Sequence, residues 1–469
     1  MEFHSLPLTE MSRLIKSREI SASELVESHL KRIDAVEGTI NAFITVMGDE
    51  ARAAAKEADQ AISQGDYRGP LHGIPVAVKD LFLTEGIRTT SGTTVMGDYV
   101  PTEDATTVAM LKSAGAVLVG KTNMNEIALG PTGLNSHYGN CNNPWNPGHM
   151  SGGSSGGSAA ATATGGCAAA LGTDTGGSVR IPAALSGTVG FKPTYGRISL
   201  FGVTELCWSL DHVGIFTRTV GDCAVVLNAI AGYDRRDPTS LDSPVPDFSA
   251  SLEEQGVSVR IGVPKEFVWD VINGEVREKV LAAIDKLSSL GASVVEVKMP
   301  WIADCAEISA AIMGGEAIAA HGTLLKEHGS ELDPAVKQRL SLGLDVSAPD
   351  YVRSQKDRAA LVQRTREVLD QVDLLAFPAC AIPAPRHGEG EVDIGGTPLD
   401  VLSAVTRLTR FANLTGFPAI SIPCGLSDEG LPIGLQLVGR PLEDHAVLKA
   451  ASAYEQATEW HRLHPSIPV

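Results

Sequence analysis

Residues 148–178 read GHMSGGSSGGSAAATATGGCAAALGTDTGGS, a dense run of glycine, serine and alanine. Glycine and proline are frequent in the whole chain too: 48 Gly and 26 Pro make up about 16% of 469 residues, against a usual share of about 12%. Such a composition is typical of a flexible linker. The flanks argue against a linker, because a turn-rich segment, 142–147, precedes the run and a helix opens after it at 179–185. We therefore predict that the run is folded.

Inside the run, the residue types predict turns that alternate with regular elements. Residues 158–164 are rich in alanine, which favours a helix, and residues 168–172 form a candidate strand of small residues. Two serine–glycine turns then lie at the ends of packed elements, and their small side chains let those elements approach closely. The run therefore reads as loop, helix, strand, glycine-rich turn and helix.

The glycine-rich turns fit one kind of chemistry better than others. No GxxxxGK[ST] is present and no GxGxxG follows a strand, so nucleotide binding is disfavoured. Two overlapping GxSxG patterns occur at 152–157, but the proline-rich segment before them denies the strand that a nucleophile elbow requires. The segment Thr175–Ser178 instead matches a serine at a helix N-terminus, where backbone N–H groups can hold an oxyanion.

Outward from this run, short apolar stretches alternate with helical patterns. Strands are predicted at 74–78, 116–119, 260–263, 293–297, 373–377, 419–422 and 433–438. Helices are predicted at 106–113, 275–290, 306–327, 349–369 and 442–459. This alternation predicts an α/β fold with a large mixed, mostly parallel central sheet covered by helices.

Two further segments have characters of their own. Residues 1–60 read as an N-terminal helical segment, in which Ser21 and Glu24 have the spacing of a capping box and His29 lies on an apolar helical face. His29 is expected to pack rather than to act in catalysis. Residues 381–398 are rich in proline and glycine and predict a long loop, suited to the rim of a site.

Charge and composition exclude several classes of function. The chain has 38 basic and 56 acidic residues and a formal net charge of −18, which disfavours nucleic acid and anionic membranes as partners. It shows no signal peptide and no apolar stretch of about 18 residues, so no membrane span and a cytoplasmic location are expected.

Seven scattered cysteines without a CxxC pair predict buried free thiols. The histidines have no metal-ligand spacing, so no metal site is expected.

The serine–glycine motifs carry a specific family resemblance. The segments Gly152–Gly157 and Gly172–Ala183 follow, over about thirty residues, the pattern of the amidase signature family, which the chain resembles. Further segments with counterparts in that family are Gly73–Asp80, Gly120–Glu126, Gly190–Gly196 and Gly434–Gly439. These motifs cover nearly the whole chain, so the resemblance implies one domain over 1–469 with the amidase signature fold.

The resemblance implies amide hydrolysis by a Ser–Ser–Lys triad with no cofactor. By motif position, Ser178 is the expected nucleophile, Ser154 the proton relay and Lys79 the base. The expected oxyanion hole consists of the backbone N–H groups of Thr175, Gly176, Gly177 and Ser178. The resemblance also implies a cis peptide bond between Gly153 and Ser154.

The residues around the triad agree with these roles. A lysine acts as a base only when neutral, so its pKa must fall from about 10.4 to about 7–8, a change of roughly 4 kcal/mol that burial can supply. Apolar residues flank Lys79 on both sides and predict its burial, while Asp80 should point to the opposite face of the strand. Asp174 and Arg180 flank Ser178 and are expected to pair and brace the turn.

Two enzymatic functions compete, and a non-catalytic binding protein is disfavoured by the intact triad. The first is an amidohydrolase that forms an acyl-enzyme with a small amide, such as an aryl amide or a carbamate. The second is the glutaminase (A) subunit of a tRNA-dependent amidotransferase, working with a partner chain. Segment 406–413 lacks the acidic residue expected to hold the glutamine amino group, although Arg358 could bind a carboxylate.

The sequence leaves the substrate and the oligomeric state open. Specificity is expected to reside in loops such as 124–140, 200–210 and 381–400. Phe201 and Trp208 fit a substrate pocket and core packing equally well. A homodimer is left open.

Overall fold

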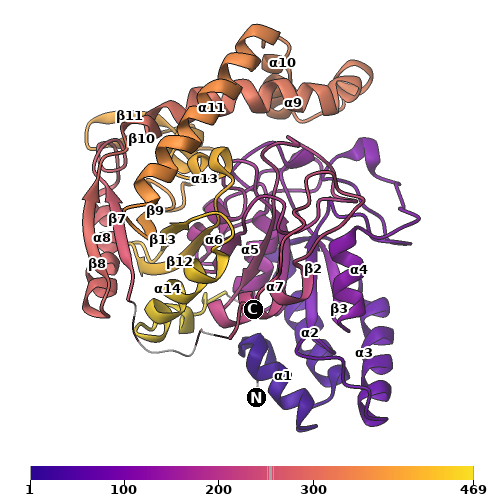
Figure 1. Cartoon of the computed structure of the whole chain (residues 1–469). Coiled ribbons are helices and arrows are strands. Elements are labelled where there is room, and N and C mark those ends of the chain that lie inside the picture. The colour runs from indigo at the N-terminus through magenta and orange to yellow at the C-terminus, as the bar shows by residue number, and fades with distance from the viewer. Residues whose placement is uncertain (1, 251, 253–255, 257, 468–469) are drawn as a thin grey trace.

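Strands from both halves of the chain hydrogen-bond into one central sheet (Figure 1). The computed structural model describes residues 2–250, 252, 256 and 258–467. Within these residues the sheet has eleven strands in the order β1-β3-β2-β4-β6-β5-β12-β13-β9-β7-β8, and β10 and β11 form a separate pair. The strand bounds are β1 Phe43–Val46, β2 Pro75–Lys79, β3 Val117–Thr122, β4 Ala169–Thr173, β5 Val189–Lys192, β6 Val213–Thr217, β7 Arg260–Pro264, β8 Ser293–Val297, β9 Leu374–Pro378, β10 Glu391–Ile394, β11 Thr397–Asp400, β12 Ala419–Leu426 and β13 Pro432–Gly439.

Helices cover both faces of this sheet (Figure 1). The α-helices are α1 Leu8–Lys16, α2 Ala22–Ile40, α3 Gly48–Ser63, α4 Thr106–Ser113, α5 Gly156–Thr164, α6 Arg180–Ser186, α7 Val220–Ile230, α8 Gly274–Ser289, α9 Cys305–His328, α10 Pro334–Gly343, α11 Ala348–Leu369, α12 Val401–Thr406, α13 Arg410–Thr415 and α14 Asp444–Gln456. The 3-10 helices are η1 Phe3–Ser5, η2 Thr94–Met96, η3 Glu126–Ala128, η4 Pro300–Asp304 and η5 Trp460–Arg462.

The predicted mixed sheet of an α/β domain is confirmed, with fewer parallel neighbours than expected. Of the ten neighbouring strand pairs in the described sheet, four are parallel and six antiparallel. The parallel pairs lie toward the two ends, around β2 and around β7. In the middle, β12 and β13 are joined by only five residues, which is too short for the crossover that parallel strands need.

The N-terminal segment is helical except for one strand. The capping box is present, since Ser21 Oγ accepts from Glu24 N and the Glu24 carboxylate accepts from Ser21 N. The prediction missed β1, four residues that pair antiparallel with β3 at the edge of the sheet. A strand this short and half exposed leaves little periodicity for the sequence to reveal.

The predicted long loop at 381–398 is wrong in its second half. There β10 and β11 form a hairpin, joined by Gly395 and Gly396, which both have positive φ. Two such residues make the tight turn that suits the twist of a hairpin. The Gly-Gly pair was the signal for this turn in the sequence.

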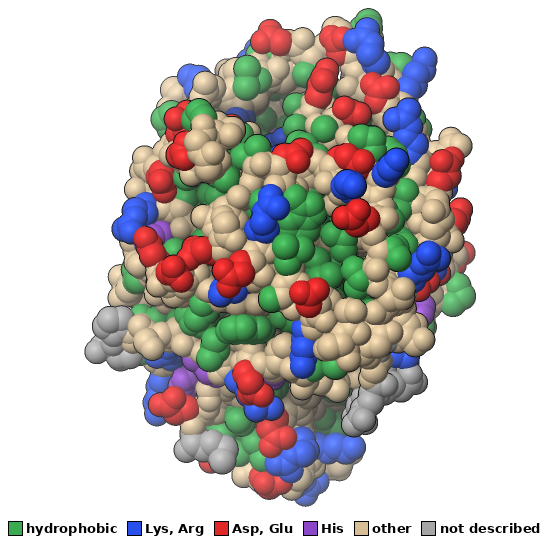
Figure 2. Space-filling view, turned by 90° about the vertical axis from the view of Figure 1, so that its left-hand side faces the viewer, with side chains coloured by type: hydrophobic (Ala, Val, Ile, Leu, Met, Phe, Trp, Pro, Cys, Tyr) green, Lys and Arg blue, Asp and Glu red, His purple; other side chains and the backbone are tan. Residues whose placement is uncertain are grey.

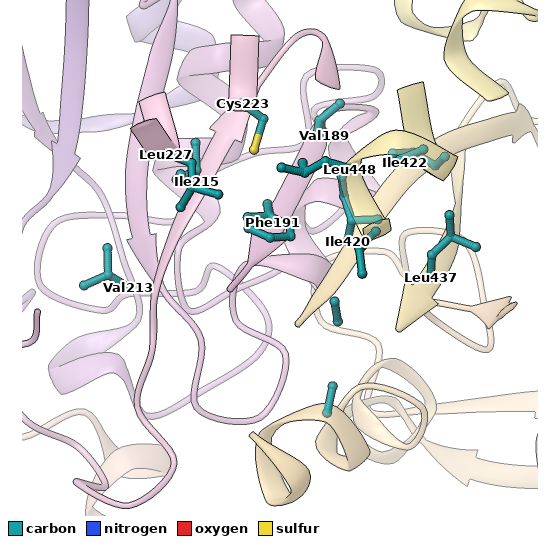
Figure 3. Packing of buried hydrophobic residues seen from close by; sticks show 14 of the residues in the cluster. Val189, Phe191, Val213, Ile215, Cys223, Leu227, Ile420, Ile422, Leu437 and Leu448 are labelled. Atoms are coloured by element: carbon teal, nitrogen blue, oxygen red, sulfur yellow. The ribbon is translucent and has the colours of Figure 1, made fainter. Parts of the chain in front are cut away.

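The two faces of the sheet bury different kinds of side chain. Large apolar residues of β5, β6, β12 and β13, among them Val189, Phe191, Ile215 and Ile420, pack on one face of the sheet against Leu227 of α7 and Leu448 of α14 (Figure 3). On the other face, Gly190 of β5 and Gly434 of β13 leave room for a helix to approach the sheet closely. A Cβ added to Gly190 would lie 2.4 Å from Ala183 Cβ, so α6 rests almost directly on the backbone of the sheet. This close approach brings α5 and α6 down onto the strand ends.

Helix α9 extends away from the sheet together with α10 and α11 (Figure 1). Among the described residues one helical stretch, Pro300–His328, is long and apolar enough to cross a membrane by length and composition alone, which the sequence pattern did not indicate. A core helix of a globular protein can meet the same test, and this stretch packs against α10, α11 and α13. On the face in Figure 2, acidic and basic side chains are interspersed, with apolar side chains gathered between them.

Candidate active site

Lys79 is the last residue of β2, and the sheet aims its side chain at the start of α5. Strands β2 and β4 run parallel, with Ala77 opposite Ala170, so both strands end at the same edge. Side chains alternate along a strand, which puts Lys79 on the same face as Ala77. Ala77 packs in the cluster that also contains the alanines of α5. In open α/β sheets, sites form where parallel strands end in this way.

Lys79 is fully buried and contacts two hydroxyl groups. Its Nζ donates hydrogen bonds to Ser154 Oγ at 2.7 Å and to Thr173 Oγ1 at 2.8 Å. Burial lowers the pKa of Lys79 to about 7, against the opposing effect of the carboxylates of Asp211 and Asp174. The amine is thus available in its neutral form near neutral pH, as the apolar flanks predicted. Asp80 points away, where it pairs with Lys121 at 3.6 Å.

The loop before α5 holds Ser154 in place beside this lysine. Its peptide bond with Gly153 is cis, as the resemblance implied. Ser155 fixes the loop to the end of β4, because its Oγ donates to Thr173 O at 3.1 Å and accepts from Thr173 N at 3.2 Å. Gly172 leaves the necessary room, since an added Cβ there would lie 2.7 Å from Ser155 Oγ. Ser155 therefore bonds the backbone.

Ser178 lies on the turn between β4 and α6, next to this serine loop. Its carbonyl oxygen accepts from Ser155 N at 3.3 Å, which ties the two serine-bearing segments together. Ser178 is 9% exposed, while Ser154 is fully buried. The Ser178 hydroxyl makes no hydrogen bond with any described residue, so it is free to face a ligand. Lys79, Ser154 and Ser178 are thus brought to one place.

Asp174 organises the turn that carries Ser178. Its carboxylate accepts hydrogen bonds from Gly177 N at 2.8 Å and Val179 N at 3.1 Å, and it pairs with Arg180 at 2.8 Å. Burial alone would raise the pKa of Asp174, but the Arg180 guanidinium and the hydrogen bonds hold it well below its ordinary value. The predicted Asp174–Arg180 brace is confirmed.

The backbone donors of this turn differ in one respect from the expectation. The N–H of Gly177 is already donated to Asp174, which removes it from the expected oxyanion hole. The N–H groups of Thr175, Gly176 and Ser178 make no hydrogen bond within the described residues and can serve as donors. The Asp174 carboxylate holds the turn by accepting hydrogen bonds from the backbone. The sequence pattern did not reveal which N–H groups donate to it.

Distant parts of the chain complete the support of the turn. Asn413 Nδ2 donates to Asp174 O and Oδ1, both at 2.8 Å, and Arg180 donates to Gln436 Oε1 at 2.6 Å. Thr175 Oγ1 donates to Asp211 at 2.6 Å. Sequence reasoning missed these partners. Gln436 lies in the Gly434–Gly439 motif, which was the only signal for it.

Thr409 fixes the remaining side of the glycine pair. Its Oγ1 donates to Gly176 O at 2.7 Å, and a Cβ added to Gly177, which has φ +123°, would lie 2.2 Å from Thr409 Oγ1. Glycine is required at this position by both space and conformation.

A cavity of about 150 Å³ opens directly above Ser178. Thr175, Gly176 and Ser178 form its floor, and Thr406, Arg339 and Arg410 are its other polar lining residues. Its apolar walls come from residues of several loops and helices, including Leu129, Ile181, Leu206, Met313 and Leu402. Loops 124–140 and 200–210 contribute to this lining as predicted, whereas the predicted loop 381–400 does not.

Other predicted candidates lie elsewhere. Phe201 and Trp208 line a second cavity of about 330 Å³ that does not include Ser178. Arg358 does not line the cavity over Ser178; it donates to Leu414 O at 2.8 Å and to Ser209 O at 2.9 Å. Within the described residues no group of three or more His, Cys, Asp or Glu side chains could hold a metal ion. The seven cysteines are free and buried, as predicted.

The comparison with known proteins agrees with this geometry. A sequence profile of the family described as "Amidase" matches residues 24–448. The (A) subunit of the glutamyl-tRNA(Gln) amidotransferase of Geotalea daltonii is 42% identical over 100% of both chains. An "Amidase" of Pseudomonas putida is 42% identical over 98% of both chains.

A solved structure extends the likeness to three dimensions. It is the inhibitor-bound form of a vestigial protein complex described as revealing the evolutionary origins of an s-triazine catabolic enzyme. Its chain superposes with a TM-score of 0.93 at 33% identity, covering 96% of this chain and 98% of that chain. The profile and these relatives span almost all of the sequence, so the chain belongs to the Amidase (amidase signature) family, enzymes that act on carbon–nitrogen bonds.

Proposed function

We propose that the chain is an amidohydrolase that cleaves a small amide through a Ser178 acyl-enzyme. One observation carries the proposal: a fully buried lysine with a pKa of about 7 lies 2.7 Å from the hydroxyl of Ser154, beside the serine that faces the cavity. A neutral amine and a serine relay can activate a second serine without histidine or metal.

The proposed reaction has two halves that balance. In the first, Lys79 takes the Ser154 proton while Ser154 takes the Ser178 proton, and Ser178 Oγ attacks the amide carbonyl. The C–N bond breaks, the proton returns through Ser154 to the leaving nitrogen, and ammonia or an amine departs. In the second half, water attacks the ester, its proton follows the same path to Ser178, and the acid is released.

The free N–H groups of Thr175, Gly176 and Ser178 stabilise the oxyanion in this proposal. Donors fixed before the reaction lower the barrier most, because they need not reorganise as charge develops. The anchoring of the turn by Asp174, Asp211 and Thr409 supports this role. A hydrogen bond between the Ser154 and Ser178 hydroxyls is proposed to form in the substrate complex, since catalytic hydrogen bonds are often completed only when substrate is bound.

The glutaminase component of a tRNA-dependent amidotransferase is the second candidate, and whole-chain similarity favours it. The Geotalea daltonii relative belongs to such an amidotransferase, and it matches this chain from end to end at 42% identity. The cavity favours the first candidate, because none of the described residues that line it is acidic and because Arg358 already donates to Ser209 and Leu414. A glutamine ammonium group would have no carboxylate partner there.

Assays of the purified chain alone distinguish the candidates. Glutamine, aliphatic amides, anilides and carbamates are compared as substrates, with Ser178→Ala as the control. The first candidate predicts that the chain purifies without a partner, hydrolyses amides other than glutamine and loses this activity in Ser178→Ala. Glutaminase activity that requires a co-purifying partner supports the second candidate. Full amide hydrolysis by Ser178→Ala contradicts both.

A further inference from the structure

The cavity over Ser178 has an unbalanced charge. Among the described residues that line it, Arg339 and Arg410 are the only charged ones, and they enter from α10 and from the start of α13. The cavity volume of about 150 Å³ is below the range of about 300–1,000 Å³ for drug-sized ligands. A small ligand filling it must therefore lie close to a guanidinium group.

Of the two arginines in the cavity, Arg410 is the one whose guanidinium has no partner among the described residues. It is half-buried, and its side chain makes no hydrogen bond or ion pair with any described residue. Asp400 is the carboxylate that raises its pKa most, against the lowering by burial, yet the two form no ion pair. Arg180 and Arg358, also deeply placed in this region, donate to carboxylate, amide or backbone oxygens.

The stem of Arg410 lies beside the oxyanion turn. A Cβ added to Gly176 would lie 3.9 Å from Arg410 Cγ. The other cationic group, Arg339, donates one hydrogen bond to Leu129 O at 2.9 Å, and its remaining N–H groups are available to a ligand. When the oxyanion turn holds the carbonyl of a substrate, a second group a few atoms further along that substrate can therefore reach the guanidinium donors.

A partly desolvated guanidinium is best matched by a carboxylate, which it can bind through two parallel hydrogen bonds. We propose that this cavity selects amides whose acyl group carries a free carboxylate and no ammonium group, with Arg410 as the main anchor. Monoamides of short dicarboxylic acids belong to this class. The inference rests on the proposed acyl-enzyme function and names its substrate class.

The same residues disfavour an amino-acid amide such as glutamine. Its ammonium group would face two cations, and like charges brought together in a desolvated cavity repel. Thr406 is the remaining polar side chain on that wall, and its hydroxyl already donates to Leu402 O at 2.7 Å. The part of the chain that the structure describes thus offers no anionic partner in this cavity that would favour glutamine over the simple monoamide.

Three matched amides test the proposal: glutaramate, which has the carboxylate; pentanamide, its neutral analogue; and glutamine, which adds the ammonium group. Values of kcat/KM are measured for the wild-type chain, Arg410→Met, Arg410→Lys and Arg353→Met. Arg353 is an exposed arginine of α11 and serves as the matched control. Binding of glutaramate and pentanamide to Ser178→Ala is measured by calorimetry, so that affinity is read without turnover.

The wild-type chain is expected to prefer glutaramate over pentanamide by roughly 10- to 100-fold, the range for charge-assisted hydrogen bonds. Arg410→Met loses this preference through a higher KM, Arg410→Lys keeps part of it, and Arg353→Met keeps all of it. Equal use of glutaramate and pentanamide, or a preference that survives in Arg410→Met, overturns the proposal and leaves the acyl-enzyme function intact. A preference for glutamine also overturns it. If no amide is turned over, the proposed function fails. If Ser178→Ala then binds glutaramate and pentanamide with equal affinity, the proposed carboxylate site is overturned as well.

Discussion

Lys79 Nζ lies 2.7 Å from Ser154 Oγ, and both side chains are fully buried. The same burial that makes a charged lysine unfavourable also keeps water away from this contact. Asp211 and Asp174 partly offset the effect of burial, so the pKa of Lys79 falls only to about 7. A base whose pKa lies near the working pH is partly neutral at that pH and still accepts a proton strongly enough to act in catalysis.

The pH dependence of kcat/KM should therefore show an acid limb near pH 7. Lys79 is inactive as a base when protonated, so activity should fall about tenfold per pH unit below its pKa and level off above it. Initial rates with one neutral amide from pH 5 to 9 measure the limb. A profile that stays flat across this range contradicts the role of Lys79.

The variant Asp211→Asn shows whether Lys79 or Asp211 produces the acid limb of kcat/KM. Burial raises the pKa of Asp211 itself to about 6, so this carboxylate could in principle produce a limb of its own. If Lys79 is responsible, removing the nearby negative charge lowers the pKa of Lys79 and moves the limb to lower pH. A limb that disappears in Asp211→Asn would assign it to Asp211 instead.

Thr173→Val should slow the chemical step without weakening substrate binding. Val has nearly the same shape but cannot accept the 2.8 Å hydrogen bond from Lys79, so the amine loses one of its two fixed partners. We expect kcat to fall by about tenfold, KM to stay the same and the acid limb to move to lower pH, because a bond that favours the protonated amine is lost. Thr107→Val is the control, since the buried Thr107 hydroxyl has no partner within the described residues. Equal losses in the two variants would reduce Thr173 to a packing role.

Asp174→Asn should destabilise the fold as well as the turn. It leaves the fully buried Arg180 without its counter-charge, for which about 3–5 kcal/mol is a typical loss. The pKa of Asp174 is held below its ordinary 3.8, so its contribution is present above that pH and is lost as pH falls through the folded-state value. The difference between the denaturant midpoints of the wild type and Asp174→Asn at pH 7 checks the first point, and the narrowing of this difference as the pH falls below 3.8 checks the second.

The matched control for Asp174→Asn is Asp350→Asn, which removes an exposed pair with Arg353. Exposed pairs contribute little to stability, so its midpoint should equal that of the wild type. Equal midpoints for Asp174→Asn and Asp350→Asn would contradict the bracing role of Asp174.

Gly177→Ala should abolish most activity by displacing the oxyanion turn. The new Cβ would meet Thr409 Oγ1 at 2.2 Å, and alanine is strained at φ +123°. Losing a single oxyanion donor in other serine hydrolases lowers kcat by about 10²–10³, and a loss of this size is expected here. Gly65→Ala has positive φ but no atom within 4 Å of the new Cβ, so it separates the effect of strain from that of the clash. A Gly177→Ala enzyme as active as Gly65→Ala would show that the turn tolerates the change.

The sequence predicts most clearly those features that depend on neighbours along the chain. The apolar residues on both sides of Lys79 predicted its burial, and the spacing of Ser21 and Glu24 predicted the capping box. Asp80, next to Lys79, points away as strand alternation requires. These properties follow from local periodicity, which a single sequence contains.

Features that depend on distant segments were not predictable in the same way. Asn413 reaches Asp174 across 239 positions, and Arg410 enters the cavity from a helix that the periodicity did not reveal. Likewise, β5 and β6 are short strands whose glycines lie against α6 and Val179. The residue types in these two strands are set by this packing, so they do not show the apolar–polar alternation that reveals a strand. Such residues acquire their roles only after the sheet has brought them together.

Labelling by a fluorophosphonate tests the central claim most directly, because this probe reacts with an activated serine and can be located by peptide mass spectrometry. We predict a single label on Ser178, with a rate that rises with pH through about 7 and falls sharply when Lys79 is replaced by Met. Ser178→Ala should take up no label while unfolding at the wild-type midpoint. A label on Ser154 or Ser155, or undiminished labelling of Ser178→Ala, would contradict the role of Ser178 as the nucleophile.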